Sequence, residues 1–80
     1  MPANPNNEIV VTGTAHIGNA IRRAREERGL DQAAFADLAD VHRTYISKFE
    51  NETPRDTIGR LLRMLTALDL ELVIRPKRRR

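Results

Sequence analysis

Apolar side chains recur at helical spacing from residue 14 onward. They occupy positions i, i+3, i+4 and i+7 of the first such stretch, as Ile17, Ala20, Ile21 and Ala24. This spacing places them on one face of an α-helix. Gly29 follows, and glycine readily takes the left-handed conformation found just past a helix end. We therefore predict a first helix over residues 14–28.

A second, shorter amphipathic stretch covers residues 32–39. Asp31 precedes it and is a favourable N-cap, because its carboxylate accepts a hydrogen bond from a free backbone N–H of the first turn. The small side chain of Ala36 leaves room for another helix to approach closely. We predict a second helix whose other inward positions are Phe35, Leu38 and Ala39.

A third helix must begin almost at once, because only Asp40 and Val41 separate the second helix from the next periodic stretch. That stretch covers residues 42–50, with Ile46 and Phe49 as its buried positions and a polar remainder. The pattern predicts two short helices joined by a tight turn.

A stripe of leucine and isoleucine predicts a fourth helix over residues 58–68. Either Asp56 or Thr57 is available as its N-cap, and Gly59 weakens the helix near its start. Because of their spacing, the apolar side chains share one helix face. The stripe consists of Ile58, Leu61, Leu62, Leu65 and Leu68.

The hydrophobic period changes from 3.6 to 2 after the fourth helix, which predicts a short strand over residues 70–75. Leu70, Leu72 and Ile74 share one face of this strand. A lone strand leaves its backbone groups unpaired, and residues 9–11 are the other candidate strand in the chain. Pairing with the same strand of a second copy is the simpler solution. We therefore assign dimerisation to Leu70, Leu72, Val73 and Ile74.

The 80 residues include no cysteine, which limits how so small a domain is stabilised. A core of this size supplies only about 3–5 kcal/mol on its own. Disulfides and thiolate metal sites are excluded, so association with a partner subunit remains. No apolar run approaches the roughly 20 residues of a membrane span, and no signal segment opens the chain. We expect a cytoplasmic protein without membrane contact.

The formal net charge of +3 suggests a polyanionic partner, but the charge is unevenly distributed. Five of the fourteen basic residues lie in the last six positions, so residues 1–74 hold nine basic and eleven acidic residues. The basic tail is either a solvated end or a non-specific phosphate contact. Arg22 with Glu26 and Arg23 with Glu27 form i, i+4 pairs, which we interpret as solvated and helix-supporting. Nucleic-acid binding must therefore be argued from particular cations.

The segment from residue 32 to residue 51, QAAFADLADVHRTYISKFEN, resembles the helix-turn-helix of the phage-repressor and Cro-like (XRE-type) superfamily. The resemblance spans residues 17–68. Asp40 stands where the family usually has glycine, and His42 stands where a Ser-type cap is common, so we expect a weaker cap on the third helix. The residues that carry the resemblance are Gln32, Phe35, Ala36, Ala39, Val41, Ile46, Ser47, Phe49 and Glu50.

This resemblance implies a mainly α fold, a four-to-five-helix repressor-type domain with one short C-terminal β-strand pairing across a homodimer. The expected organisation has four parts. Residues 1–13 form a polar, flexible segment, residues 14–69 form the helix-turn-helix DNA-binding domain, residues 70–75 form the dimerisation strand, and residues 76–80 form the basic tail.

The DNA major groove is about 12 Å wide and accepts one α-helix, while a second helix held across it by a short turn sets the first against the phosphates. Side chains near the start of the inserted helix then meet base edges. Arg43 suits guanine O6 and N7, and Thr44 suits thymine. The expected base-contacting residues are His42, Arg43, Thr44 and Lys48. The resemblance assigns phosphate contact or helix positioning to Gln32, Tyr45, Ser47 and Asn51.

Several of these residues also have a simpler interpretation. Without the motif, Arg43 and Lys48 are ordinary surface cations, and Tyr45 covers the surface between the third and fourth helices. His16 and His42 have no partner at metal-ligand spacing, so no zinc site is predicted. The sequence has no recognisable catalytic set and no glycine-rich phosphate loop. We expect neither an enzyme nor a cofactor.

Residues 61–76, LLRMLTALDLELVIRP, are similar to the end of HipB-type antitoxins, where a helix leads into a strand that pairs with its twin. The similarity implies the antitoxin of a type II toxin–antitoxin module. Such a homodimer represses its own operon at an inverted repeat, and it restrains a HipA-like serine/threonine kinase toxin. When bound to DNA it is associated with the nucleoid. Two alternatives stay open, a stand-alone phage- or plasmid-type transcription regulator and a protein-interaction module on the same fold.

Overall fold

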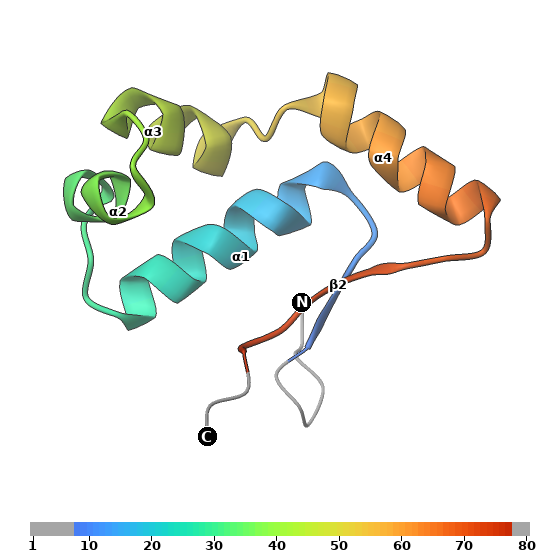
Figure 1. Cartoon of the computed structure of the whole chain (residues 1–80), viewed down its shortest axis with the longest axis horizontal. Coiled ribbons are helices and arrows are strands. Elements are labelled where there is room, and N and C mark those ends of the chain that lie inside the picture. Colours follow the sequence, from blue (N-terminus) through green and yellow to red (C-terminus); the bar gives the residue numbers. More distant parts are fainter. Residues whose placement is uncertain (1–7, 78–80) are drawn as a thin grey trace.

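The computed structural model describes residues 8–77, which form four helices and two short strands (Figure 1). The chain is mainly α, as predicted. Residues 1–7 of the segment expected to be flexible, and residues 78–80 of the basic tail, lie outside the described residues. The elements in order are β1 (Ile9–Val11), α1 (Thr14–Glu27), α2 (Gln32–Ala39), α3 (Arg43–Asn51), α4 (Arg55–Ala67) and β2 (Leu72–Ile74).

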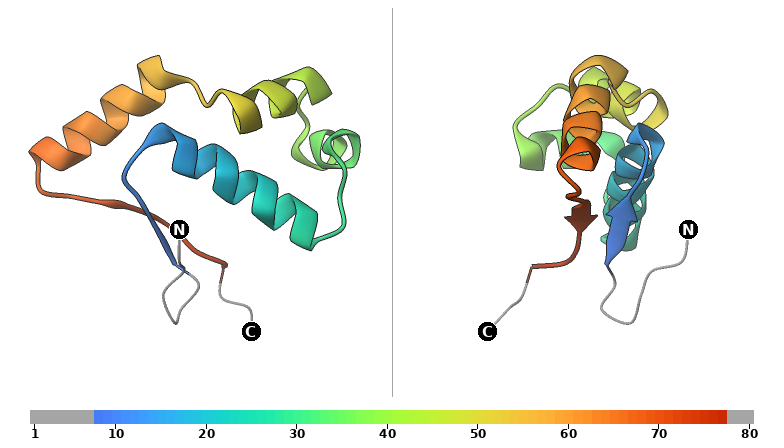
Figure 2. Two further views of the ribbon diagram at one scale, coloured as in Figure 1. Left: turned by 180° about the vertical axis from the view of Figure 1, so that it is seen from behind. Right: turned by 90° about the vertical axis from the view of Figure 1, so that its right-hand side faces the viewer.

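Helix α1 is the central element of the fold. It contacts α3, α4 and β1, and α2 packs against α3. The helices α2 and α3 occupy one end of the molecule and α4 the other, with α1 between them (Figures 1 and 2). The molecule therefore has a helix-turn-helix half, made by α1 to α3, and a second half made by α4 and the two strands.

The turns around α2 follow the sequence closely. The Asp31 carboxylate accepts a hydrogen bond of 2.7 Å from the backbone N–H of Ala34, which confirms the predicted N-cap. Gly29 and Asp40 both take the left-handed conformation, with φ of 68° and 58°. Aspartate tolerates this conformation better than most residues, so Asp40 replaces the family's usual glycine in the turn.

The start of α4 differs from the prediction. The helix begins at Arg55, directly after Pro54, and neither Asp56 nor Thr57 acts as its cap. Proline lacks the backbone N–H and is accepted only at the beginning of a helix, so Pro54 sets the boundary. Asp56 instead falls in the first turn, where its negative charge faces the positive end of the helix dipole.

The buried core lies mainly between α1, α2 and α3. Val11, Ala20, Ala36 and Ile46 are its buried apolar residues within 8–77. Ala36 is nearly inaccessible, as expected for a close helix contact. Leu38, predicted to face inward, is 72% exposed. Two residues along a helix correspond to a rotation of about 200°, so a helix that buries Ala36 must turn Leu38 outward. Ala39 and Ala24 are also exposed.

The C-terminal strand pairs within its own chain. β2 runs antiparallel to β1, with Ile9 opposite Ile74 and Val11 opposite Leu72. The sequence favoured pairing between two copies, and it assigned residues 9–11 to a flexible segment; both expectations differ from the described fold. A tethered strand pairs without the loss of freedom that a second molecule imposes.

Contacts with α1 hold β1 in place. Val11 is buried, and the backbone N–H of Thr12 donates a hydrogen bond of 3.1 Å to Nδ1 of His16. His16 thus fixes the junction between β1 and α1. Because the described sheet has only two strands, β2 keeps one edge without a strand beside it.

The apolar stripe of α4 is only partly covered. Ile58, Leu62 and Leu65 are half-buried against the rest of the chain. Leu61, Met64 and Leu68, which lie three and four residues apart, are exposed, at 37%, 59% and 70%. Leu70, just after the helix, is 55% exposed. We call Leu61, Met64 and Leu68 the outer α4 face.

Candidate nucleic-acid interface

Helix α3 has one buried side and one exposed side. Ile46 and Glu50, one turn apart, are buried, and Phe49 is half-buried. The predicted base-contacting residues all lie at the start of α3 or on its exposed side. The exposed residues from the start of the helix to its end are His42, Arg43, Thr44, Tyr45, Lys48 and Asn51.

The four residues predicted to contact phosphate or to position the helix have different surroundings. Ser47 and Gln32 are half-buried. Tyr45 is 55% exposed, and its ring lies 6.0 Å from that of Phe49, at an angle of 32°. Tyr45 therefore lies against Phe49 of its own helix, and about half of the residue remains exposed to a partner.

His42 caps α3 in spite of its unusual side chain. Its Nδ1 atom accepts a hydrogen bond of 3.1 Å from the backbone N–H of Thr44. The weaker cap expected from the sequence is thus replaced by an imidazole that occupies the role of a Ser or Asp oxygen.

A buried carboxylate joins the three helices of the helix-turn-helix half. The Glu50 side chain is fully enclosed, and Arg25 binds both of its oxygens, with Nε–Oε2 and Nη2–Oε1 distances of 2.7 and 3.0 Å. Gln32 of α2 donates to Oε1 over 3.3 Å, and Arg22 donates to it over 3.5 Å. We call these four residues the Glu50 cluster.

The hydrogen bonds of the Glu50 cluster shift its titration. The Arg25 guanidinium, helped by Gln32 and Arg22, lowers the pKa of Glu50 below its ordinary value of 4.5, although burial acts in the opposite direction. The bond to Glu50 likewise raises the pKa of Arg25. The carboxylate is therefore charged when the protein is folded at neutral pH, and it is matched by cations from α1.

Arg22 has a different role from the one the sequence suggested. It does not form the predicted solvated pair with Glu26. Its Nη2 atom donates a hydrogen bond of 2.7 Å to Oδ1 of Asn51 and one of 3.5 Å to the backbone carbonyl oxygen of Glu50. It therefore orients the Asn51 side chain at the end of α3. One feature of the sequence could have predicted this role. Glu50 lies four residues after Ile46, on the inward side of α3, and a buried carboxylate requires a cationic partner.

Gly18 permits the close contact between α1 and the end of α3. A Cβ atom at this position would lie 2.5 Å from Oγ1 of Thr53 and 2.8 Å from the Phe49 carbonyl oxygen. Thr53 is buried, and its hydroxyl donates 2.8 Å to the same carbonyl oxygen. Sequence analysis missed Gly18, because glycine inside a helix carries no apolar signal.

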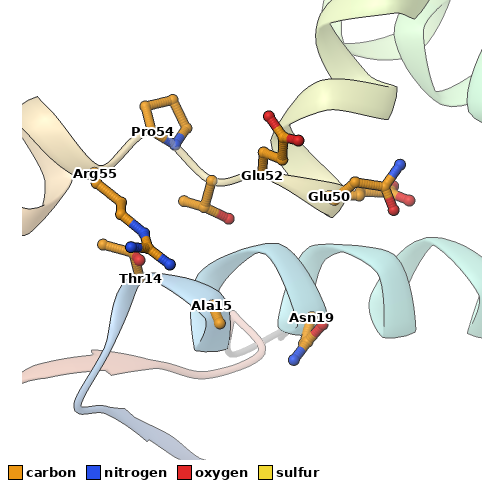
Figure 3. A pocket seen from close by; sticks show the side chains of 9 residues that line it. Thr14, Ala15, Asn19, Glu50, Glu52, Pro54 and Arg55 are labelled. Atoms are coloured by element: carbon orange, nitrogen blue, oxygen red, sulfur yellow. The ribbon is translucent and has the colours of Figure 1, made fainter.

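A polar pocket of about 560 Å³ lies between the start of α1 and the loop joining α3 to α4. Asn51, Thr53 and Arg55 line it, and the Arg55 side chain extends from the start of α4 toward Thr14 (Figure 3). Arg55 is an exposed cation beyond the end of α3, and the sequence analysis did not single it out.

Residues 8–77 contain no group of three or more His, Asp or Glu side chains arranged to hold a metal ion. No helix within this range is long and apolar enough to cross a membrane.

Three curated relatives are similar to the chain. The uncharacterized HTH-type transcriptional regulator y4dL of Sinorhizobium fredii is 34% identical over 65 residues, which cover 81% of this chain and 33% of y4dL. The HTH-type transcriptional regulator PrpR of Mycobacterium tuberculosis is 38% identical over 53 residues, 66% of this chain and 11% of PrpR. RamB, an HTH-type transcriptional regulator of the same species, is 33% identical over 49 residues, 61% of this chain and 10% of RamB.

The chain thus spans a third of y4dL and about a tenth of the other two relatives. No solved structure matches the chain. The helix-turn-helix family matches residues 21–74, from the middle of α1 to the end of β2. All three of these relatives are named as HTH-type transcriptional regulators. With more than half of its residues in the match, the chain belongs to the helix-turn-helix family.

Proposed function

We propose that the chain is a sequence-specific DNA-binding transcriptional repressor that inserts α3 into the major groove. The observation that carries this proposal is the division of α3 into a fixed side and an exposed side. Glu50 holds the helix on α1, while Arg43, Thr44 and Lys48 lie exposed toward solvent. The names of the relatives, all transcriptional regulators, support the same function.

The exposed side chains suit distinct parts of the duplex. Arg43 matches guanine O6 and N7 through its two-pronged guanidinium, and Thr44 matches thymine or any hydrogen-bonding edge. Asn51, held by Arg22 at the last position of α3, and Arg55, at the start of α4, suit phosphate oxygens. Gln32 and Ser47 act through the position of α3, since Gln32 is bonded to Glu50.

Arg43→Ala tests the specific contact. A binding site is first selected from random duplexes with the wild-type chain. Loss of the guanidinium should weaken binding to that site by about 1–3 kcal/mol and leave binding to random DNA nearly intact. Arg23→Ala, which removes an exposed cation from α1, is the matched control and should change specific binding little.

Two outcomes contradict parts of this proposal. Equal losses on specific and random DNA would assign Arg43 to phosphate alone. Failure to select any preferred duplex would argue against a repressor and favour the protein-interaction module on the same fold. Arg55→Ala separates phosphate contact from base contact, because it should weaken binding to every duplex and reduce the slope of log affinity against log salt by about 0.9.

We further propose that the repressor is a homodimer, with the outer α4 face as its main contact. The exposed leucine and methionine side chains on this face are too apolar to remain in water on so small a protein. Among the predicted dimerisation residues, Leu72 and Ile74 are half-buried in their own chain, while Leu70 and Val73 are exposed. The free edge of β2 is a second contact available to the partner.

A two-fold dimer also predicts the arrangement of the operator. Two α3 helices that enter successive major grooves on one side of the duplex lie about 34 Å apart, so the operator is an inverted repeat whose half-sites are about one helical turn apart.

Sedimentation tests whether the outer α4 face is the dimer contact. Wild type should be a dimer and Met64→Lys a monomer, whereas Leu38→Lys, at a more exposed apolar site on α2, should remain a dimer. A monomeric wild type would overturn the proposal.

The finer proposal is that this repressor is the antitoxin of a type II module that restrains a HipA-like serine/threonine kinase. The resemblance of residues 61–76 to the end of HipB-type antitoxins supports it, as does the order of α4 and β2 in the fold. Expression of a kinase encoded beside the gene should arrest growth, and co-expression of this chain should relieve the arrest. No such relief, or no kinase frame beside the gene, would leave a stand-alone regulator.

A further inference from the structure

We infer that His42 presents only a hydrogen-bond donor to DNA, and that it thereby excludes cytosine from the base position it faces. This inference rests on the proposed function, because it assumes that α3 enters the major groove. It assigns a specificity role to the residue that caps α3.

The cap determines where the proton on the imidazole sits. Nδ1 of His42 lies 3.1 Å from the backbone nitrogen of Thr44, which always carries a hydrogen. Nδ1 therefore supplies a lone pair to this hydrogen bond, and the ring carries a hydrogen on Nε2.

The opposite edge of the ring is available to a partner. His42 is exposed, and Nε2 makes no hydrogen bond to another of residues 8–77. Arg43 and Thr44, the next two residues, are exposed beside it. The Nε2–H group is thus a donor of fixed polarity at the end of the helix that meets base edges.

Fixed polarity discriminates among bases because their major-groove edges differ. Guanine offers N7 and O6 as acceptors, adenine offers N7, and thymine offers O4, whereas cytosine offers only its N4 amino donor. An Nε2–H group bonds to an acceptor and is repelled by the cytosine amino group. A phosphate oxygen is also an acceptor. The duplex therefore offers two kinds of partner to the Nε2–H donor, a base edge and the backbone.

The polarity can be reversed while the cap is kept. Asp at position 42 caps α3 with one carboxylate oxygen and turns an acceptor toward DNA, whereas Asn caps with Oδ1 and keeps a donor on its amide nitrogen. His42→Asn is therefore the matched control for His42→Asp. Circular dichroism of the two variants should be the same, since both retain the cap.

The experiment compares binding sites selected from random duplexes by each protein. Wild type and His42→Asn should deplete cytosine at one position of each half-site, and His42→Asp should favour cytosine there, because an aspartate accepts from cytosine N4. His42→Ala should lose any preference at that position and bind the wild-type site roughly three- to tenfold more weakly.

Modified duplexes then separate the two sources of acceptor. If the partner is a purine N7, a 7-deazapurine at the selected position should weaken wild type about as much as His42→Ala does, with no further loss in the variant. If the partner is a phosphate, one methylphosphonate should have that effect, and His42→Asp should lose affinity without gaining cytosine. The first result supports the inference, whereas the second assigns the Nε2 donor to the DNA backbone and overturns the exclusion of cytosine.

The inference is overturned if His42→Ala keeps both the affinity and the base preference of wild type. The control for the proposed function is Arg43→Ala in the same selection. If Arg43→Ala alters the selected sites and His42→Ala does not, the repressor function stands and the inference about His42 fails. If no protein selects a site, the proposed function fails first.

Discussion

The two halves of the molecule differ in how completely they are packed. In the helix-turn-helix half, Ala36 and Ile46 are buried, and the Glu50 cluster joins α1, α2 and α3. In the other half, α4 has no buried residue, and Met64 and Leu68 are mostly exposed. The first half encloses its charged cluster within one chain, although Leu38 of α2 is 72% exposed, whereas the second leaves several apolar side chains of one helix uncovered.

This difference separates two tasks. A helix that inserts into DNA must keep its angle, and buried hydrogen bonds on its inner side hold that angle while its outer side stays free for bases. A surface that binds a partner must keep apolar groups exposed in the single chain. Substitutions at buried positions of the first half should therefore act on folding stability, those on the exposed side of α3 on DNA binding, and those on the outer α4 face on association.

The largest effect is expected from Glu50→Ala. It leaves Arg25 and Arg22 without their shared carboxylate, and breaking such a buried pair is strongly destabilising. Because the Arg22 side chain is 39% exposed, solvent screens part of the loss. We expect the free energy of unfolding to fall by about 2–3 kcal/mol, measured by urea denaturation. Glu27→Ala, at an exposed site on α1, should change the free energy of unfolding little. Equal losses in the two variants would show that the Glu50 cluster does not stabilise the fold.

Gly18→Ala should destabilise the same half by overpacking. The new Cβ would lie within 3.0 Å of Thr53 Oγ1 and of two backbone carbonyl oxygens, which cannot move without shifting α3 against α1. Such overpacking typically costs about 1–3 kcal/mol. Thermal unfolding measures the loss. An unchanged melting temperature would indicate that the contact between α1 and α3 is looser than described.

Acid should weaken the helix-turn-helix half through Glu50. Its pKa is lowered on folding, so its stabilising effect is fully present above the ordinary value of 4.5 and is lost as the pH falls through the lower, folded-state value. The free energy of unfolding should therefore decrease below about pH 4.5. Glu50→Gln, which does not titrate, should show a flatter dependence. Identical pH profiles for the two proteins would contradict this assignment.

Gly59→Ala should have the smallest effect and the opposite sign. A Cβ at this position of α4 meets only ordinary contacts, 3.7 Å from Arg63 Nη1 and 4.0 Å from Thr14 Cγ2. Alanine favours the helix over glycine by about 0.5–1 kcal/mol, so the melting temperature should rise. If Gly18→Ala and Gly59→Ala both lower the melting temperature, the difference in packing between the two halves does not explain the effects of these substitutions.

Local rules made most elements of this fold predictable from the sequence. Periodicity and caps depend on residues within one or two turns, so α2 was predicted with its observed bounds. The N-cap at Asp31 and the left-handed turn at Asp40 followed from the same local chemistry. The helix-turn-helix motif was likewise recognisable, because its apolar and small residues recur at fixed spacing.

Contacts between distant segments were decided only by the tertiary structure. The partner of β2 proved to be β1, some sixty residues away, and Arg22 proved to bond Glu50 and Asn51 on another helix. Gly18 matters only because Thr53 lies against it. Sequence spacing sets which side of a helix a residue occupies, but the partner it meets depends on how the helices pack, and no local pattern records that.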